Sequence, residues 1–130
     1  MQYQFVVPDG SEDVVERALT VFGGATVPAF LAVLKRFGDR CGGPLSFPRP
    51  GWTLAVDLPA RHGDRLAAVL DRLDLEVAEA GGAVYLVKDS RCRSDLVAAM
   101  HPRLDEWRMA RNQLDPERRF VSDLSRRMAL

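Results

Sequence analysis

The chain has 130 residues, of which 47% are hydrophobic and 28% are charged, and this length and composition predict one globular domain. Its 18 Lys and Arg residues balance 18 Asp and Glu residues, so the net charge is zero and gives no electrostatic reason to expect nucleic acid as a partner. No apolar run approaches the length of a membrane span and no signal peptide precedes the first strand, which predicts a cytoplasmic or peripheral membrane protein.

The cysteines and histidines argue against a metal site, and we expect none. Cys41 and Cys92 form no C-x-x-C pair, and His62 and His101 do not stand near them at the spacing of zinc ligands. The sequence leaves open whether the two cysteines could form a disulfide bond.

The first third of the chain predicts a strand, a helix and a second strand. Alternating residues predict a strand over Gln2–Val7, and Asp9 with Glu12 suggests a capping box for a helix over about 10–22. The apolar stretch Val27–Phe37 is compatible with helix or buried strand, and its place between turn-rich segments favours strand.

Further elements follow in regular order. After a loop over 38–50, the clearest strand of the chain covers Trp52–Leu58. We expect the remaining elements to be a helix over about 63–80, a strand over Ala83–Lys88, and three helices over Ser94–Met100, Leu104–Leu114 and Ser122–Met128.

The order through Lys88 is β-α-β-β-α-β, which predicts an α+β, ferredoxin-like antiparallel sheet with a C-terminal helical extension. Right-handed crossovers place both helices on one face of the sheet and make the first and third strands central. Strand alternation assigns to the helix-covered face Tyr3, Phe5, Trp52, Leu54, Val56, Val84 and Leu86. We call the opposite face the helix-free face, and we expect it to expose Gln4, Lys35, Thr53, Ala55, Asp57 and Tyr85.

Lys88 ends the last strand in a polar run, Lys88-Asp89-Ser90-Arg91, that an apolar core would not contain. A lysine delivered by a buried strand is one way to build a site on a sheet. An edge strand that ends in a charged turn accounts for the same pattern. In a regular strand Lys88 and Tyr85 would point to opposite faces of the sheet, so they reach one site only if the strand bends or ends there.

Several stretches together resemble one family: QYQFVVP, VLKRFG, PLSFPRPGW, AVDLP, YLVKDSR, MHPRLDEW and DPERRFVSDLSRR. They are similar, in the right order, to the C-terminal part of the decaprenylphosphoryl-β-D-ribose 2′-oxidase family. These are FAD-dependent oxidoreductases of the vanillyl-alcohol oxidase superfamily, related to D-arabinono-1,4-lactone oxidase. The resemblance implies oxidation of a secondary alcohol of a sugar-like or lipid-linked sugar substrate, with hydride transfer to flavin N5.

The resemblance also implies that residues 1–130 are a single substrate (cap) domain and that an N-terminal FAD-binding domain, the main site of FAD, is absent. A chain whose first residues already read as a strand likewise suggests a fragment or a domain cut from something longer. By family analogy, a short-chain reductase is a partner.

By position, four polar residues match those that line the family's active site. Lys88 matches the lysine beside the flavin N1–C2=O edge, and Tyr85 and Gln4 match further cofactor contacts. The reaction also needs a base, and Lys35 or Tyr85 could relay the hydroxyl proton, between which the sequence does not choose. Lys88, Tyr85 and Lys35 are therefore the candidate catalytic residues. Without the family, the pattern favours an exposed edge lysine for Lys35 and a tyrosine at the rim of the core for Tyr85.

The implied substrate pocket contains Gln4, Lys35 and apolar wall positions, together with two residues that differ from those of the family. Leu31 and Val33 match the wall. Thr53 stands where the arabinan-pathway enzymes have asparagine and Ala55 where they have cysteine, which puts the substrate in doubt. The competing hypotheses are an inactive fragment and a stand-alone module that binds a ligand or self-associates through its helix-free face.

Overall fold

A four-stranded antiparallel sheet with the strand order β2-β3-β1-β4 forms the centre of the molecule. The computed structural model describes residues 1–24, 27–39, 42–59 and 63–130, so Cys41 and His62 lie outside the described residues. Strands β1 and β3 are central, as the sequence predicts. The strands are β1 (Gln2–Val7), β2 (Leu31–Phe37), β3 (Gly51–Asp57) and β4 (Ala83–Val84).

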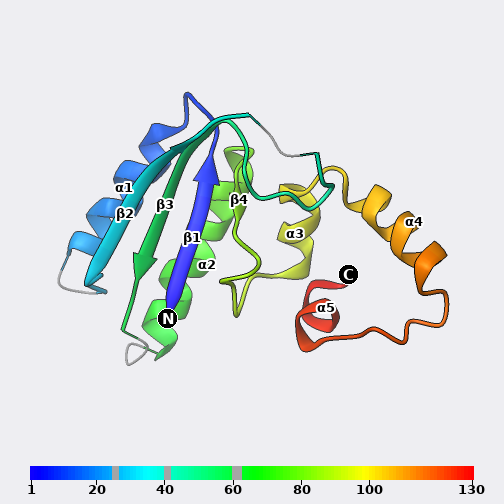
Figure 1. Ribbon diagram of the computed structural model, residues 1–130. Coiled ribbons are helices and arrows are strands. Elements are labelled where there is room, and N and C mark those ends of the chain that lie inside the picture. The colour runs from blue at the N-terminus through cyan, green and yellow to red at the C-terminus, as the bar shows by residue number, and fades with distance from the viewer. Residues whose placement is uncertain (25–26, 40–41, 60–62) are drawn as a thin grey trace.

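Two long helices lie against one face of this sheet and three shorter helices lie beside its β4 edge (Figure 1). Helices α1 (Glu12–Gly23) and α2 (Gly63–Glu79) supply the covering layer. Helices α3 (Ser94–Met100), α4 (Leu104–Leu114) and α5 (Asp123–Met128) form the C-terminal extension. The order of elements and the strand order together confirm the predicted α+β sheet topology.

The hydrophobic core lies between the sheet and the two long helices. Its sheet side is formed by the predicted alternate residues, because successive strand side chains point to opposite faces. Trp52 and Leu86 are the exceptions. Both are half-exposed, Leu86 lies beyond the end of β4, and the Arg36 guanidinium lies 5.3 Å from the centre of the Trp52 ring. The buried core residues of the strands on this face are Tyr3, Phe5, Val7, Leu54, Val56 and Val84.

The start of α1 differs from the predicted capping box. Ser11 occupies the N-cap position and its side chain makes no capping hydrogen bond. Asp9 instead accepts a hydrogen bond from Arg36 Nη2 at 2.8 Å, so its carboxylate ties the turn to β2. The ambiguous segment 27–37 does contain a strand, which begins only at Leu31.

The predicted strand Ala83–Lys88 is wrong beyond Val84, where β4 ends. Lys88 N–H donates to the Tyr85 carbonyl at 3.0 Å, so the chain turns back instead of continuing along β1. The backbone N–H of Asp89 likewise donates to the Leu86 carbonyl at 3.2 Å, so turn bonds take the place of strand pairing in this segment. Beyond the turn, the Asp89 carboxylate accepts the backbone N–H groups of Arg91 and Cys92.

Candidate functional site

One cross-strand row on the helix-free face brings four of the predicted site residues into line. Val33 of β2 pairs with Ala55 of β3, and Ala55 pairs with Gln4 of β1. Tyr85 N–H donates to the Gln4 carbonyl at 2.8 Å, which places Tyr85 next in the same row. Residues opposite one another in neighbouring strands lie about 5 Å apart, so these side chains share one surface.

The neighbouring rows place the other strand residues of the site on the same face. Lys35 pairs with Thr53, and Leu31 pairs with Asp57. Lys35 and Leu31 are exposed because β2 is an edge strand of this sheet. The sheet therefore gathers every strand residue that the sequence assigns to the site.

The prediction that Gln4, Thr53 and Ala55 are exposed is wrong. Gln4 is 7% exposed and Thr53 is fully buried. Phe47, from the loop between β2 and β3, lies over part of this face. Its ring stacks on Tyr85 at a centroid distance of 4.6 Å and meets Phe37 edge-on at 5.6 Å. Phe47 therefore lies between residues of the two sheet edges and covers one end of the helix-free face.

Thr53 is bonded in a way that turns it toward the protein. Its hydroxyl donates to the Phe5 carbonyl at 2.8 Å and accepts from Gln4 Nε2 at 3.0 Å. A buried hydroxyl with both functions in use cannot contact a ligand directly in this structure. Its effect on a bound molecule would be exerted through the orientation of the Gln4 amide.

Lys88 reaches the site through the turn that replaces the end of the predicted strand. Its Nζ lies 5.9 Å from the centre of the Tyr85 ring, within the range of a cation–π contact. Both side chains are half-buried. In a continuous strand these two side chains would point to opposite faces of the sheet. Because β4 ends before Tyr85, both side chains reach the same site, as the sequence analysis required.

A buried polar network lies between the sheet and helix α2, and the sequence analysis did not predict it. Tyr3 donates its hydroxyl to Asp74 Oδ1 at 2.8 Å, and Arg91 donates to Asp74 Oδ2 from both Nη atoms at 2.8 Å. Arg91 also pairs with Asp71. A signal existed: Asp74 follows Leu70 by four residues on the apolar stripe of α2, and a buried Tyr3 hydroxyl needs a partner.

The Asp74 carboxyl should make stability depend on pH. Burial raises its pKa from the usual 3.8 to about 6, although Arg91 and the Tyr3 hydroxyl oppose this shift. Because the folded-state pKa lies above the unfolded value, the folded state binds the proton more tightly. The stabilisation is complete below about pH 4 and is lost as the pH rises through about 6. Two pKa units correspond to roughly 3 kcal/mol.

The measurement is the free energy of unfolding by urea between pH 4 and 8, for the parent and for Asp74→Asn. Other carboxyls, such as Asp115, have lowered pKa values and act in the opposite direction, so the informative quantity is the difference between the two proteins. We expect the parent to lose stability relative to Asp74→Asn as the pH rises. A difference that stays constant with pH would contradict this assignment.

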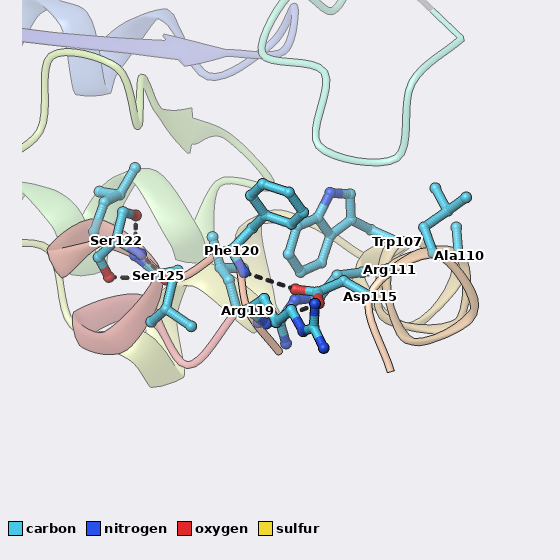
Figure 2. Close-up of a pocket in the computed structure, with 12 residues that line it drawn as sticks. Trp107, Ala110, Arg111, Asp115, Arg119, Phe120, Ser122 and Ser125 are labelled. Atoms are coloured by element: carbon cyan, nitrogen blue, oxygen red, sulfur yellow. Dashed lines mark hydrogen bonds between the residues drawn. The ribbon is translucent and has the colours of Figure 1, made fainter. Parts of the chain in front are cut away.

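A groove lies in the C-terminal extension, away from the sheet (Figure 2). It runs between α4 and α5 and is lined by apolar side chains that include Trp107 and Phe120. Asp115 shapes one wall, because its carboxylate accepts the backbone N–H groups of Arg119 and Phe120 at 2.8 and 3.0 Å. The sequence-predicted site residues, all of which the structure describes, do not line this groove.

Within residues 1–24, 27–39, 42–59 and 63–130, no group of three or more His, Cys, Asp or Glu side chains is placed to hold a metal ion. Burial raises the pKa of the Cys92 thiol to about 12, which leaves it protonated and unreactive at neutral pH. Among the helices of those same ranges, none combines the length and the apolar character that a membrane crossing requires.

No family model matches the chain, and its relatives among known proteins include the following two. The chain is 48% identical over 131 residues to an uncharacterised protein in the mprA 5′ region of Streptomyces coelicolor, covering 98% of this chain and 35% of that protein. It is 41% identical over 130 residues to decaprenylphosphoryl-beta-D-ribose oxidase of Mycolicibacterium smegmatis, covering 100% of this chain and 28% of that protein. The chain is related to this oxidase.

The alignment covers about a third of the length of these relatives. It spans the whole sheet and the C-terminal helices, so it includes every residue of the candidate site.

Proposed function

We propose that this chain forms the substrate portion of an FAD-dependent oxidoreductase that oxidises a secondary alcohol of a sugar-like molecule. Its relation to a protein named as an oxidase supports the class of reaction. The single observation that supports the location is the cross-strand row of Val33, Ala55 and Gln4, which ends at Tyr85 under the Lys88 ammonium.

The residues present fit a flavin ring. The row places an amide and small apolar side chains on one sheet face, and a cation, Lys88, lies at its end against an aromatic ring. Lys88, Tyr85 and Gln4 would contact the cofactor, whose main binding site is an N-terminal FAD-binding domain of the longer protein. When bound, FAD supplies the hydride acceptor, N5.

Lys88 provides a fixed positive charge beside the N1–C2=O edge. A preorganised charge at the place where negative charge develops stabilises the transition state without a cost of reorganisation. An ammonium acts there as a compact point charge on its aliphatic stem. The contact with Tyr85 restricts where this charge lies.

The hydroxyl proton of the substrate has two candidate acceptors, Lys35 and Tyr85. They belong to opposite edges of the sheet, and three strand spacings separate β2 from β4, or roughly 14 Å. The two side chains therefore approach a bound substrate from opposite sides, and one of them accepts the proton. Gln4 orients the substrate, and Leu31, Val33 and Ala55 form the wall.

The substrate class that we propose is a decaprenylphosphoryl-ribose or an aldonolactone. A lipid-linked sugar would bring the protein to the membrane periphery, and a short-chain reductase would then complete the conversion of the product. The second candidate function is a ligand-binding or dimerisation module without catalytic activity. It is favoured by the exposure of Phe30, Leu31 and Leu34 at the β2 edge, since clustered apolar side chains at a surface promote association.

The test uses the full-length protein that contains this chain. We expect it to purify with bound FAD and to be reduced anaerobically by polyprenylphosphoryl ribose or by an aldonolactone. A full-length protein that binds no flavin, and that forms dimers which β2-edge substitutions dissociate, would favour the module.

Replacing Ala55 by leucine should block the substrate pocket. Ala55 lies mid-row between Gln4 and Val33, so three extra carbons project from the helix-free face. Overfilling costs typically about 1–3 kcal/mol, which corresponds to about a 5- to 150-fold loss in kcat/KM. The matched control is Ala32→Leu. Ala32 lies on the adjacent strand, is exposed, and points to the opposite face of the sheet. Equal kcat/KM values for the two folded variants would show that Ala55 does not face the substrate.

A further inference from the structure

The turn that carries Lys88 has little apolar packing at its tip. Lys88 and Asp89 close two successive backbone turns, with N–H donation to the carbonyls of Tyr85 and Leu86 at 3.0 and 3.2 Å. Val87, at the tip, is 77% exposed. Few buried contacts at the tip mean that its position depends on the polar contacts of the residues that follow.

Asp89 supplies such contacts. Oδ1 accepts the backbone N–H of Cys92 at 2.9 Å and that of Arg91 at 3.1 Å, so one carboxylate fixes the next three residues. Oδ2 accepts Arg127 Nη1 of α5 at 2.8 Å. The side chain of Asp89 is 1% exposed, so its carboxylate makes these charge-assisted bonds out of contact with water, while the Arg127 side chain stays 32% exposed.

Arg127 joins both ends of the segment to α5. Besides the Asp89 carboxylate, its Nη1 donates to the Cys92 carbonyl at 3.0 Å and its Nη2 to the Asp89 carbonyl at 3.5 Å. The neighbouring Arg91 ties the same segment to α2 through Asp74. The segment that follows Lys88 is therefore held from two helices, by Asp89 to α5 and by Arg91 to α2.

A buried ion pair often contributes little net stability compared with an apolar replacement, so stability alone is a weak explanation for this one. What the pair does provide is one fixed backbone position directly after Lys88. We propose that Asp89 and Arg127 are positioning residues that hold the 85–92 turn so that the Lys88 ammonium stays over the Tyr85 ring. This inference rests on the function proposed above, in which Lys88 supplies the charge beside the flavin.

The sequence allows a direct measurement, because Lys35 and Lys88 are its only lysines. Selective ¹³C labelling of lysine in this chain gives two ε-methylene signals by NMR. The Lys88 signal should be shifted upfield by the ring current of Tyr85, and Lys35, exposed on β2, serves as the internal reference. In Asp89→Asn and Arg127→Gln we expect the Lys88 signal to move toward that of Lys35.

The matched control is Arg126→Gln, which removes an exposed ion pair from the same helix and should leave the Lys88 signal in place. If Asp89→Asn does not fold, Arg127→Gln decides, because it leaves the backbone bonds of Asp89 intact. A Lys88 signal unchanged in folded Arg127→Gln would overturn the proposal.

The NMR readout requires no flavin, so it separates this inference from the proposed function. In the flavin-loaded full-length protein, Arg127→Gln should lower kcat for flavin reduction and leave KM near its parent value. Movement of the Lys88 signal without an effect on kcat would uphold the positioning and contradict the role of Lys88 in the reaction. An unmoved signal contradicts the positioning whatever the kinetics show.

Discussion

Replacing Lys88 by alanine in the flavin-loaded full-length protein should slow flavin reduction by about 10²–10³-fold, because removal of one preorganised stabiliser of developing charge costs about 3–4 kcal/mol. The fold should persist, since the half-buried lysine lies in a turn and its ammonium contacts the Tyr85 ring rather than the core. Lys88→Arg should restore only part of the rate, because a planar guanidinium does not reproduce a point charge.

The measurement is anaerobic reduction of the flavin by substrate in a stopped-flow spectrometer, at saturating substrate. Flavin content and the melting temperature are measured first, so that a slow rate reflects the reaction and not loss of cofactor. If a folded, flavin-loaded Lys88→Ala protein is reduced at the parent rate, Lys88 has no role in the reaction and is only a solvated lysine in a surface turn.

Replacing Arg91 by alanine should destabilise the chain by about 3–5 kcal/mol, the usual cost of removing one partner from a buried ion pair. Asp74, with 1% of its side chain exposed, would keep its Tyr3 contact and lose both bonds from the guanidinium. Because Arg91 opposes the rise in the pKa of Asp74, its removal raises that pKa further. The loss of stability should therefore be larger at pH 8 than at pH 5.

Urea unfolding at the two pH values measures this effect. The matched control is Arg93→Ala, two residues away, whose ion pair with Asp95 leaves more than half of each side chain exposed. Exposed pairs contribute at most about 1 kcal/mol, so the control should remain close to the parent. Similar losses in Arg91→Ala and Arg93→Ala would contradict a structural role for the buried network.

The fold is predictable from the sequence because its signals are local. Alternation in Gln2–Val7 and around Trp52, and the apolar periodicity of the two long helices, define the order of elements. The alternation of side chains along those strands then places Gln4 and Ala55 on one face, and the pairing of β1 with β3 brings them opposite each other. The family resemblance selected Lys88 and Tyr85, and the structure places them in contact.

The remaining features depend on contacts between residues that are distant in sequence. Phe47 lies over one end of the helix-free face because the loop between β2 and β3 folds back over the sheet, and nothing in the alternation of the strands indicates this. Strand β4 ends at Val84, where backbone turn bonds begin, and the segment after the turn is held by residues of α2 and α5 that are distant in sequence. The partner of Asp74, seventeen residues away, likewise becomes evident only when α2 is placed beneath the sheet.

The most direct test of the central claim, that Lys88 supplies the charge beside the flavin, is the flavin midpoint potential in the full-length protein. Lys88→Ala and Lys35→Ala each remove one positive charge from the helix-free face, so Lys35→Ala controls for net charge. Lys88→Ala should lower the potential by several tens of millivolts more than Lys35→Ala, since about 30 mV corresponds to about 1.4 kcal/mol for a two-electron couple. Equal potentials in the two folded, flavin-loaded variants would contradict the placement of Lys88 at the cofactor.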